Sequence, residues 1–223
     1  IYVGSGEADM RSDISQGDGM YKSVDGGKTW THIGLTDSQQ IERILVAPSD
    51  AKHVYVAALG HPYGPNDERG VFESRDGGAS WQKILGPNAD TGAIDLAFEP
   101  GNPSTIYAAL WQTRRPPWNI YPPSNGPGSG LYKSTDGGER WTRIEGHGFA
   151  SGTVGRIGLA ISAAAPKRVA AIVDGDQGGL YRSDDAGTTW MKTTGDARIW
   201  QRGWYFGQIT ADPKNPDRVY AMN

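Results

Sequence analysis

Carboxylate side chains occur at several places where the sequence predicts long loops or a strand facing a central channel. Cleavage of a glycosidic bond uses two carboxyl groups, about 5–5.5 Å apart for retention of configuration and about 6.5–9.5 Å apart for inversion. The best candidates for such catalytic groups are Glu7, Asp18, Glu68 and Asp95, and further loop carboxylates are Asp9, Asp13 and Asp67.

Aromatic and arginine side chains gather in the same predicted loops. Trp and Tyr offer apolar faces with polar edges, and Arg offers a rigid fork of donors. This combination suits a glycan, and it suits a peptide with polar side chains equally well. Alternatively, the same side chains stack on one another and cover the loops. The candidate ligand-binding residues are Arg11, Tyr63, Arg69, Trp111, Arg114, Arg115, Trp118, Arg202 and Trp204, with Tyr121 and Trp200 nearby in sequence.

The composition narrows the possible partners. The chain has 223 residues, a formal net charge of −3, four His and no Cys. A mildly acidic balance gives no electrostatic basis for binding nucleic acid or an anionic membrane. No apolar run approaches the roughly 20 residues of a membrane span, so membrane insertion is not expected. No two His have a metal-ligand spacing, and we expect no metal and no cofactor.

One motif recurs four times along the chain. Each copy has a Ser, an Asp two residues later, a Gly two residues after that and a Trp three residues further on. Around each copy lie four apolar runs of strand length, with no helical periodicity. Four antiparallel strands in a repeat of about 50 residues are typical of a β-propeller blade. The copies occupy residues 23–30, 74–81, 134–141 and 183–190.

The repeat predicts an all-β fold: a β-propeller of four-stranded antiparallel blades, forming a single propeller domain or fragment over residues 1–223. The strands amount to about four blades and a fraction. The chain opens at "IYVGSG" and stops at "RVYAMN", both inside strand-like runs. We therefore expect a part of a larger ring, with further blades or domains in a longer chain.

The Asp and Trp of the motif are predicted to be structural. A short Asp side chain accepts hydrogen bonds from turn N–H groups, Gly supplies positive φ, and a Trp ring packs between blades. The alternative makes the Asp residues catalytic acids or calcium ligands, but four equivalent copies around a ring cannot converge on one substrate. The predicted structural residues are Asp25, Trp30, Asp76, Trp81, Asp136, Trp141, Asp185 and Trp190.

The motif S-x-D-x-G-x-[TS]-W is identified as the Asp-box, or bacterial neuraminidase repeat. Three copies fit it, and the copy at 134–141 departs with Arg140 before the Trp. Stretches such as "VYVAALGHPYGPNDERGVF" resemble exported bacterial proteins described as sortilin-like or as glycosyl hydrolases. The resemblance implies an extracytoplasmic protein, secreted or periplasmic, with a carbohydrate-related function. A sialidase is not expected, because the Phe/Tyr-Arg-Ile-Pro signature is missing.

Loop lengths indicate where a site would lie. The Asp-box turns share one face of the disc with the short turns between first and second strands. The opposite face carries long segments, at 4–19, 60–70, 111–130 and 195–208. Long loops usually have a function, so we place the site there. Aligned first strands also put Arg43 and Asp95 at one equivalent position, where they serve either the channel mouth or an interblade ion pair.

Two functions remain open from the sequence. The first is a carbohydrate-related propeller, glycoside-hydrolase-like if it is an enzyme, with its site on the face opposite the Asp-boxes. The second is a non-catalytic, sortilin-like propeller that binds a peptide or protein or serves as a scaffold. The expected partner is accordingly a glycan or a peptide.

Overall fold

The computed structural model describes residues 1–11, 13–116, 118 and 125–222. Regular structure in these residues is almost entirely antiparallel strand, with two short 3-10 turns at Thr36–Ser38 and Ala197–Ile199. The strands form five sheets, numbered here as blades 1 to 5 in chain order. The predicted all-β propeller of four-stranded blades is confirmed.

The strands within each blade follow one another in sequence order, so every blade is a simple meander. The blades are made as follows: blade 1 of β1 (Tyr2–Gly4), β2 (Met20–Lys22) and β3 (Thr31–His32); blade 2 of β4 (Ile41–Ala47), β5 (Asp50–Ala58), β6 (Gly70–Ser74) and β7 (Gln82–Leu85); blade 3 of β8 (Thr91–Glu99), β9 (Asn102–Gln112), β10 (Gly130–Ser134) and β11 (Thr142–Arg143); blade 4 of β12 (Val154–Ile161), β13 (Val169–Gly175), β14 (Gly179–Ser183) and β15 (Met191–Thr194); blade 5 of β16 (Gln208–Ala211) and β17 (Val219–Met222).

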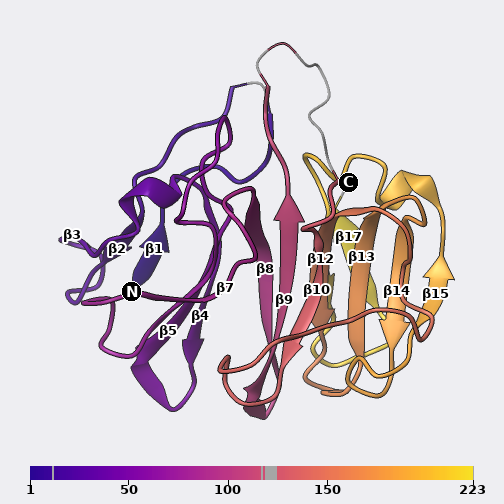
Figure 1. Cartoon of the computed structure of the whole chain (residues 1–223). Helices are drawn as coiled ribbons and strands as arrows, with labels where there is room; N and C mark the ends of the chain where they lie inside the picture. The colour runs from indigo at the N-terminus through magenta and orange to yellow at the C-terminus, as the bar shows by residue number, and fades with distance from the viewer. Residues whose placement is uncertain (12, 117, 119–124, 223) are drawn as a thin grey trace.

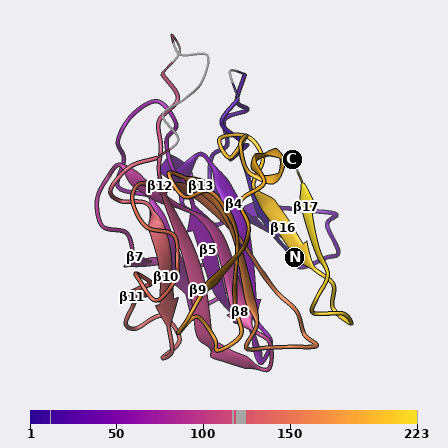
Figure 2. The same cartoon turned by 90° about the vertical axis from the view of Figure 1, so that its right-hand side faces the viewer.

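The first strands of the blades lie next to one another. β4 contacts β8, β8 contacts β12, and β12 contacts β16. Figure 1 shows the sheets of blades 1 to 4 side by side in chain order, and Figure 2 shows the yellow strands of blade 5 at the right. The first loop and the segment after β9 rise on the same side, at the top of both views. Side chains from different blades can therefore meet where the first strands begin.

The core lies in the interfaces between consecutive blades, which we call seams. At each of the first three seams, the Asp-box Trp of one blade packs against the preceding blade: Trp81, Trp141 and Trp190. Trp30, in the first copy, remains 43% exposed. Burial of such rings supplies much of the packing energy of a fold, so the blades stabilise one another in sequence.

Polar contacts reinforce the seams at the Asp-box turns. A second-strand Tyr of one blade donates from its hydroxyl to a box carbonyl of the next: Tyr55 to Gly137, and Tyr107 to Ala186, both at 2.8 Å. The residue after the box Asp adopts positive φ in every copy, and Ala186 holds this conformation with φ of 58° where the other copies have Gly.

Each box Asp ties its own turn together. The Ser hydroxyl donates to the Asp carboxylate at 2.8 Å in all four copies. The N–H four residues after the Asp donates to the same oxygen at 2.8–3.0 Å. In three copies a hydroxyl at that position also donates, at 2.6 Å. These hydroxyl bonds hold the pKa of Asp25, Asp76 and Asp185 well below its usual range.

The third box lacks this hydroxyl because Arg140 occupies the position. The pKa of Asp136 is also lowered, but chiefly by the Arg140 N–H. We expect Arg140→Thr to lower the pKa of Asp136 further and to stabilise the protein near neutral pH. A lowered pKa stabilises the fold above the ordinary Asp pKa of about 3.9, and this gain disappears as the pH falls through the lowered value. Carboxyl NMR titration and urea unfolding at several pH values measure both effects.

The matched reverse change is Ser80→Arg in the second box. It removes the hydroxyl that donates to Asp76 at 2.6 Å, so the pKa of Asp76 should rise and stability near neutral pH should fall. If the two changes move the two pKa values in the same direction, the hydroxyl is not the cause.

Candidate functional site

Irregular pairing at the starts of the first strands re-aims charged side chains. In β4 the register shifts between Ile41 and Arg43, which leaves Glu42 outside the regular pairing. In β12 it shifts between Val154 and Ile157, around Arg156. A β-bulge interrupts the alternation of a strand and redirects a side chain, and bulges are common beside functional sites. Here Glu42 and Arg156 are directed toward each other.

These residues form what we call the axial cluster: Asp9, Glu42, Arg156 and Gln208. Arg156 places one guanidinium nitrogen 2.8 Å from Asp9 Oδ1 and another 3.3 Å from Glu42 Oε1. Gln208 donates from Nε2 to the same Glu42 oxygen at 2.6 Å. The cluster thus joins the first loop, β4, β12 and β16, which belong to different blades.

The axial cluster is largely withdrawn from solvent. The side chain of Arg156 is 2% exposed, that of Glu42 14% and that of Asp9 34%. Burial raises the pKa of Glu42; the charge of Arg156 opposes this shift and the charge of Asp9 adds to it. A carboxyl group with a raised pKa can keep its proton and act as a general acid. A second carboxyl group that is ionised can then act as the base.

The two carboxylates of the cluster are close together. Asp9 and Glu42 contact two nitrogens of the same Arg156 guanidinium, so this one group bridges the two carboxylates. Glycosidases hold their two carboxyl groups roughly 5–9.5 Å apart, with the glycosidic bond between them. In this structure the guanidinium of Arg156 lies between the two groups.

An aromatic rim adjoins the axial cluster. We define it as Arg202, Trp204, Tyr205 and Phe206, which precede β16. The rings of Trp204 and Tyr205 are stacked, with centroids 5.7 Å apart. The Arg202 guanidinium lies 5.2–5.9 Å from the three ring centroids. The carbonyl of Trp204 accepts from the Met10 N–H at 3.1 Å, which fastens the rim to the first loop.

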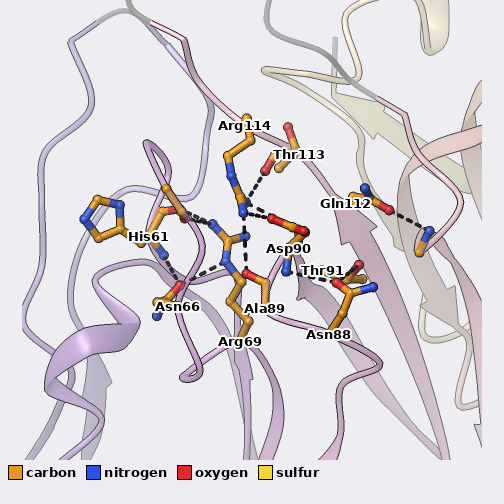
Figure 3. Close-up of polar contacts among 12 residues, drawn as sticks. His61, Asn66, Arg69, Asn88, Ala89, Asp90, Thr91, Gln112, Thr113 and Arg114 are labelled. Atoms are coloured by element: carbon orange, nitrogen blue, oxygen red, sulfur yellow. Dashed lines mark hydrogen bonds and ion pairs between the residues drawn. The ribbon is translucent and has the colours of Figure 1, made fainter.

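A second polar network supports the loops near blades 2 and 3 (Figure 3). The Arg69 side chain is fully buried. It donates to the carbonyls of Leu59, at 2.9 Å, and of Gly64, at 3.1 Å, to the carbonyl of His61, and to Asn66 Oδ1. Burial lowers the pKa of Arg69 to about 9. The network therefore holds the 60–70 loop in shape.

Arg114 plays a similar part for the segment after β9. Figure 3 shows its guanidinium between Asp90 and Thr113. It forms an ion pair with Asp90 and donates to the Thr113 carbonyl at 3.0 Å. Arg115 is 4% exposed and donates to the Arg11 carbonyl at 2.8 Å. These contacts fasten residues 113–116, directly after β9, to the neighbouring loops.

The predicted catalytic carboxylates have other partners. Glu7 contacts Arg11 at 2.6 Å, and Asp18 accepts from the Tyr21 hydroxyl at 2.7 Å. That hydrogen bond lowers the pKa of Asp18. Glu68 is half-buried, with one oxygen enclosed and without a hydrogen-bond partner among the described residues. Within the described part of the chain, no hydrogen bond or ion pair joins Glu7, Asp18 and Glu68 to one another.

Asp95 is a structural link between blades. One oxygen accepts from Arg43 Nε at 2.8 Å and from the Leu96 N–H at 2.9 Å. The other accepts from the Leu159 N–H at 2.8 Å. Asp95 is 5% exposed, and β4, β8 and β12 meet at its carboxylate. Of the two roles predicted for Arg43 and Asp95, the structure shows the interblade ion pair.

The candidate binding residues divide by burial. Trp111 and Arg69 are fully buried and Arg115 is 4% exposed, so protein encloses these three side chains in this structure. Trp111 packs in the core, beneath the Arg156 guanidinium, at 5.8 Å from its ring centroid. Tyr63 and Trp118 are 50% and 81% exposed. Arg11 lies 5.9 Å from the Tyr205 ring, beside the rim, and Tyr121 lies outside the described residues.

Glu42 and Arg156 were missed by sequence reasoning. The signal was present, because both are charged residues at the start of an otherwise apolar first strand. The alignment of the first strands on the turns that follow them singled out Arg43 and Asp95 instead. Among the described residues, no group of His, Cys, Asp or Glu assembles that could hold a metal ion. Within the same residues, no helix has the length and apolar character to cross a membrane.

Comparisons with known proteins place the chain among propellers of this type. A family model of the Sortilin-Vps10 type, described as "Sortilin, neurotensin receptor 3", matches residues 18–148. That range is 131 of 223 residues, or more than half of the chain. No curated protein matches the chain.

Several solved structures are similar in fold. An ancestral GH74 enzyme has a TM-score of 0.67 and 20% identity, covering 95% of this chain and 27% of its own. The GH74 xyloglucanase from Xanthomonas campestris has a TM-score of 0.62 and 19% identity, covering 98% and 32%. The GH74 enzyme of Niastella koreensis has a TM-score of 0.62 and 23% identity, covering 96% and 34%. The chain thus spans about a third of the length of these relatives.

Proposed function

The chain belongs to the Sortilin-Vps10 family, and from this premise we propose that it is a carbohydrate-binding propeller. The proposed site is the axial cluster together with the aromatic rim, on the face opposite the Asp-boxes. The observation that carries the proposal is the meeting of a buried carboxyl–arginine pair with stacked aromatic rings. The rings suit the apolar face of a sugar, and the charged groups suit its hydroxyls.

A glycoside-hydrolase-like activity is the enzymatic form of this proposal. Glu42, whose pKa is raised by burial, would donate a proton to the glycosidic oxygen as the C–O bond breaks. Asp9 would take a proton from the water that attacks the anomeric carbon. The guanidinium of Arg156 lies between the two carboxylates, and this favours recognition over hydrolysis. The similarity to the GH74 enzymes supports the propeller fold of this proposal, and it does not bear on the activity.

The second candidate is non-catalytic binding of a peptide or protein. Family membership favours it, since the description of the matching family model names a receptor. The same rim and axial cluster would serve as recognition groups. An extracytoplasmic location and further blades in a longer chain also remain proposals. The first rests on resemblance, and the second is supported by the coverage of about a third of the related chains.

Binding measurements on the purified chain test the site. We expect Trp204→Ala to weaken binding of a glycan from a screened panel by at least about tenfold, because truncating an aromatic hot-spot residue costs about 2 kcal/mol or more and about 1.4 kcal/mol is already tenfold. The matched control is Trp30→Ala, which removes a half-exposed Trp of an Asp-box. Equal loss in both variants, or loss in neither, would contradict the proposed face. Circular dichroism checks that each variant is folded.

The same panel separates the two functions. Binding of short peptides in place of glycans would favour the second candidate. Hydrolysis is measured by the appearance of new reducing ends, and Glu42→Gln should abolish it while glycan binding persists. Unchanged hydrolysis in Glu42→Gln would remove Glu42 from that role.

A further inference from the structure

Two arginine side chains between blades 2 and 3 share a single carboxylate. Arg69 precedes β6 and Arg114 follows β9, and Figure 3 shows their guanidinium groups close together with Asp90 beside them. Arg114 forms the ion pair with Asp90. The Arg69 guanidinium donates to three carbonyls and to one amide oxygen, all of which are uncharged. Two positive groups therefore face one negative group.

The other acidic residues nearby do not balance this excess. Within the described residues, neither Asp67 nor Glu68 forms an ion pair or hydrogen bond with these guanidinium groups. Burial and the charge of Arg114 lower the pKa of Arg69 to about 9, and the carboxylate of Asp90 opposes this shift only in part. No acidic residue occurs at the remaining positions of the sequence, 12, 117, 119–124 and 223. A buried charge without a counterion is costly, so an anion that binds beside it is favoured.

The ion pair lies on the open side of this group. The side chain of Asp90 is 54% exposed and that of Arg114 is 22% exposed, whereas Arg69 is fully buried. An exposed ion pair is weak because water competes for both partners, so a carboxylate from solution can replace Asp90. Such a ligand contacts Arg114 directly and is attracted by the charge of Arg69 as well.

Aromatic side chains adjoin the arginine pair. The Arg115 N–H donates to the Pro62 carbonyl at 2.7 Å, which holds the segment after β9 against the 60–70 loop. Tyr63, the next residue of that loop, is 50% exposed, and its ring meets the His61 ring edge-on with centroids 6.3 Å apart. An aromatic ring suits the apolar C–H face of a sugar. A sugar that carries a carboxylate matches both features.

We propose that Arg114, with Arg69 beneath it and Tyr63 beside it, binds the carboxylate of an acidic glycan built of uronic acid units. The planar fork of a guanidinium matches the two oxygens of a carboxylate. In this structure Asp90 occupies the position that the ligand carboxylate takes over. Asp90 immediately precedes β8, so the site lies at the same end of the blades as the axial cluster. The inference rests on the proposed carbohydrate-binding function and names the class of glycan.

Two matched oligosaccharides test the proposal on the purified 223-residue chain. One is trigalacturonate, and the other is the same oligosaccharide with its carboxyl groups reduced to neutral hydroxymethyl groups. Isothermal titration calorimetry should show tighter binding of the acid form. Arg114→Gln should weaken that binding at least about tenfold, because it removes charge-assisted hydrogen bonds. The reduced form should bind both proteins equally, and circular dichroism checks the fold of the variant.

A gain of affinity provides a check that a misfolded loop cannot imitate. Asp90→Asn removes the competing carboxylate, so it should strengthen binding of the acid form by about threefold or more. The matched control is Glu145→Gln, which removes an exposed carboxylate from its ion pair with Arg143. This control should leave the affinity unchanged.

The outcomes distinguish this proposal from the proposed function. Equal affinity for the two oligosaccharides would overturn the proposal, and so would an acid form that binds Arg114→Gln and Asp90→Asn as it binds the wild type. The effect of Trp204→Ala on glycan binding is independent of these results. Binding of neither oligosaccharide would also overturn the proposal, and the proposed function fails with it only if the whole glycan panel does not bind.

Discussion

Replacing Asp95 by Ala is expected to lower the free energy of unfolding by about 2–4 kcal/mol, because each buried donor left without a partner costs about 1–3 kcal/mol. The change would leave the N–H groups of Leu96 and Leu159 without a hydrogen-bond acceptor. It would also remove the ion-pair partner of Arg43. The carboxylate is nearly inaccessible to solvent, so water cannot easily replace it. Urea unfolding followed by tryptophan fluorescence measures the loss.

The matched control is Asp90→Ala, which also removes a carboxylate paired with an Arg. The side chain of Asp90 is 54% exposed, and exposed ion pairs contribute about 0–1 kcal/mol. Similar losses in the two variants would show that Asp95 does not link the blades. Asp95→Asn keeps one acceptor oxygen, so it should fall between wild type and Asp95→Ala.

Arg156→Leu is expected to destabilise the protein by about 3–5 kcal/mol at pH 7, the usual cost of removing one partner from a buried ion pair. The carboxylate of Glu42 would then lie buried without its cation. Glu42 already has a raised pKa, and removing Arg156 should raise that pKa further. Protonation would therefore relieve the strain of the buried charge in the folded state.

The sign of the pH dependence follows from that shift. A group whose pKa is raised by folding favours the folded state below its unfolded pKa, about 4.3 for Glu, and this contribution is lost as the pH rises through the folded pKa. The deficit of Arg156→Leu should thus be smaller at acidic pH than at pH 7. Urea unfolding at a series of pH values measures it.

Arg156→Leu combined with Glu42→Leu provides the control. Since this double variant has no buried carboxylate at position 42, its stability should recover, and the pH dependence of the deficit should flatten. A deficit that is the same at every pH, or that grows on acidification, would contradict the assigned role of Glu42. Double-mutant cycles isolate the coupling between the two positions.

The fold was predictable because its signals are local and repeated. The Ser-x-Asp-x-Gly turn and the following Trp fix where third and fourth strands meet, and the copies at 23–30, 74–81, 134–141 and 183–190 set the length of a blade. The turn is held within eight residues by its own hydrogen bonds. No long-range information is needed to recognise it.

The site was harder to predict from the sequence, because it depends on β-bulges and on residues that are distant in sequence. Glu42 meets Arg156 across 114 positions in sequence, and Asp9 meets it across 147. The register shift in β4 takes Glu42 out of the regular strand pairing, and this irregularity brings it into the cluster. Trp111 and Arg69 stand at the ends of strands beside long loops, and their burial depends on how those loops fold back.

The contacts of Arg156 bear on how the blades unfold. Seams join each blade only to its neighbours, and an array with nearest-neighbour coupling can lose a terminal unit while the rest stays folded. Arg156 binds side chains of blade 2 and of the first loop from its place in blade 4. These links skip over blade 3, so the opening of blade 4 withdraws support from blade 2 at the same time. A single buried guanidinium thus adds cooperativity between units that share no seam.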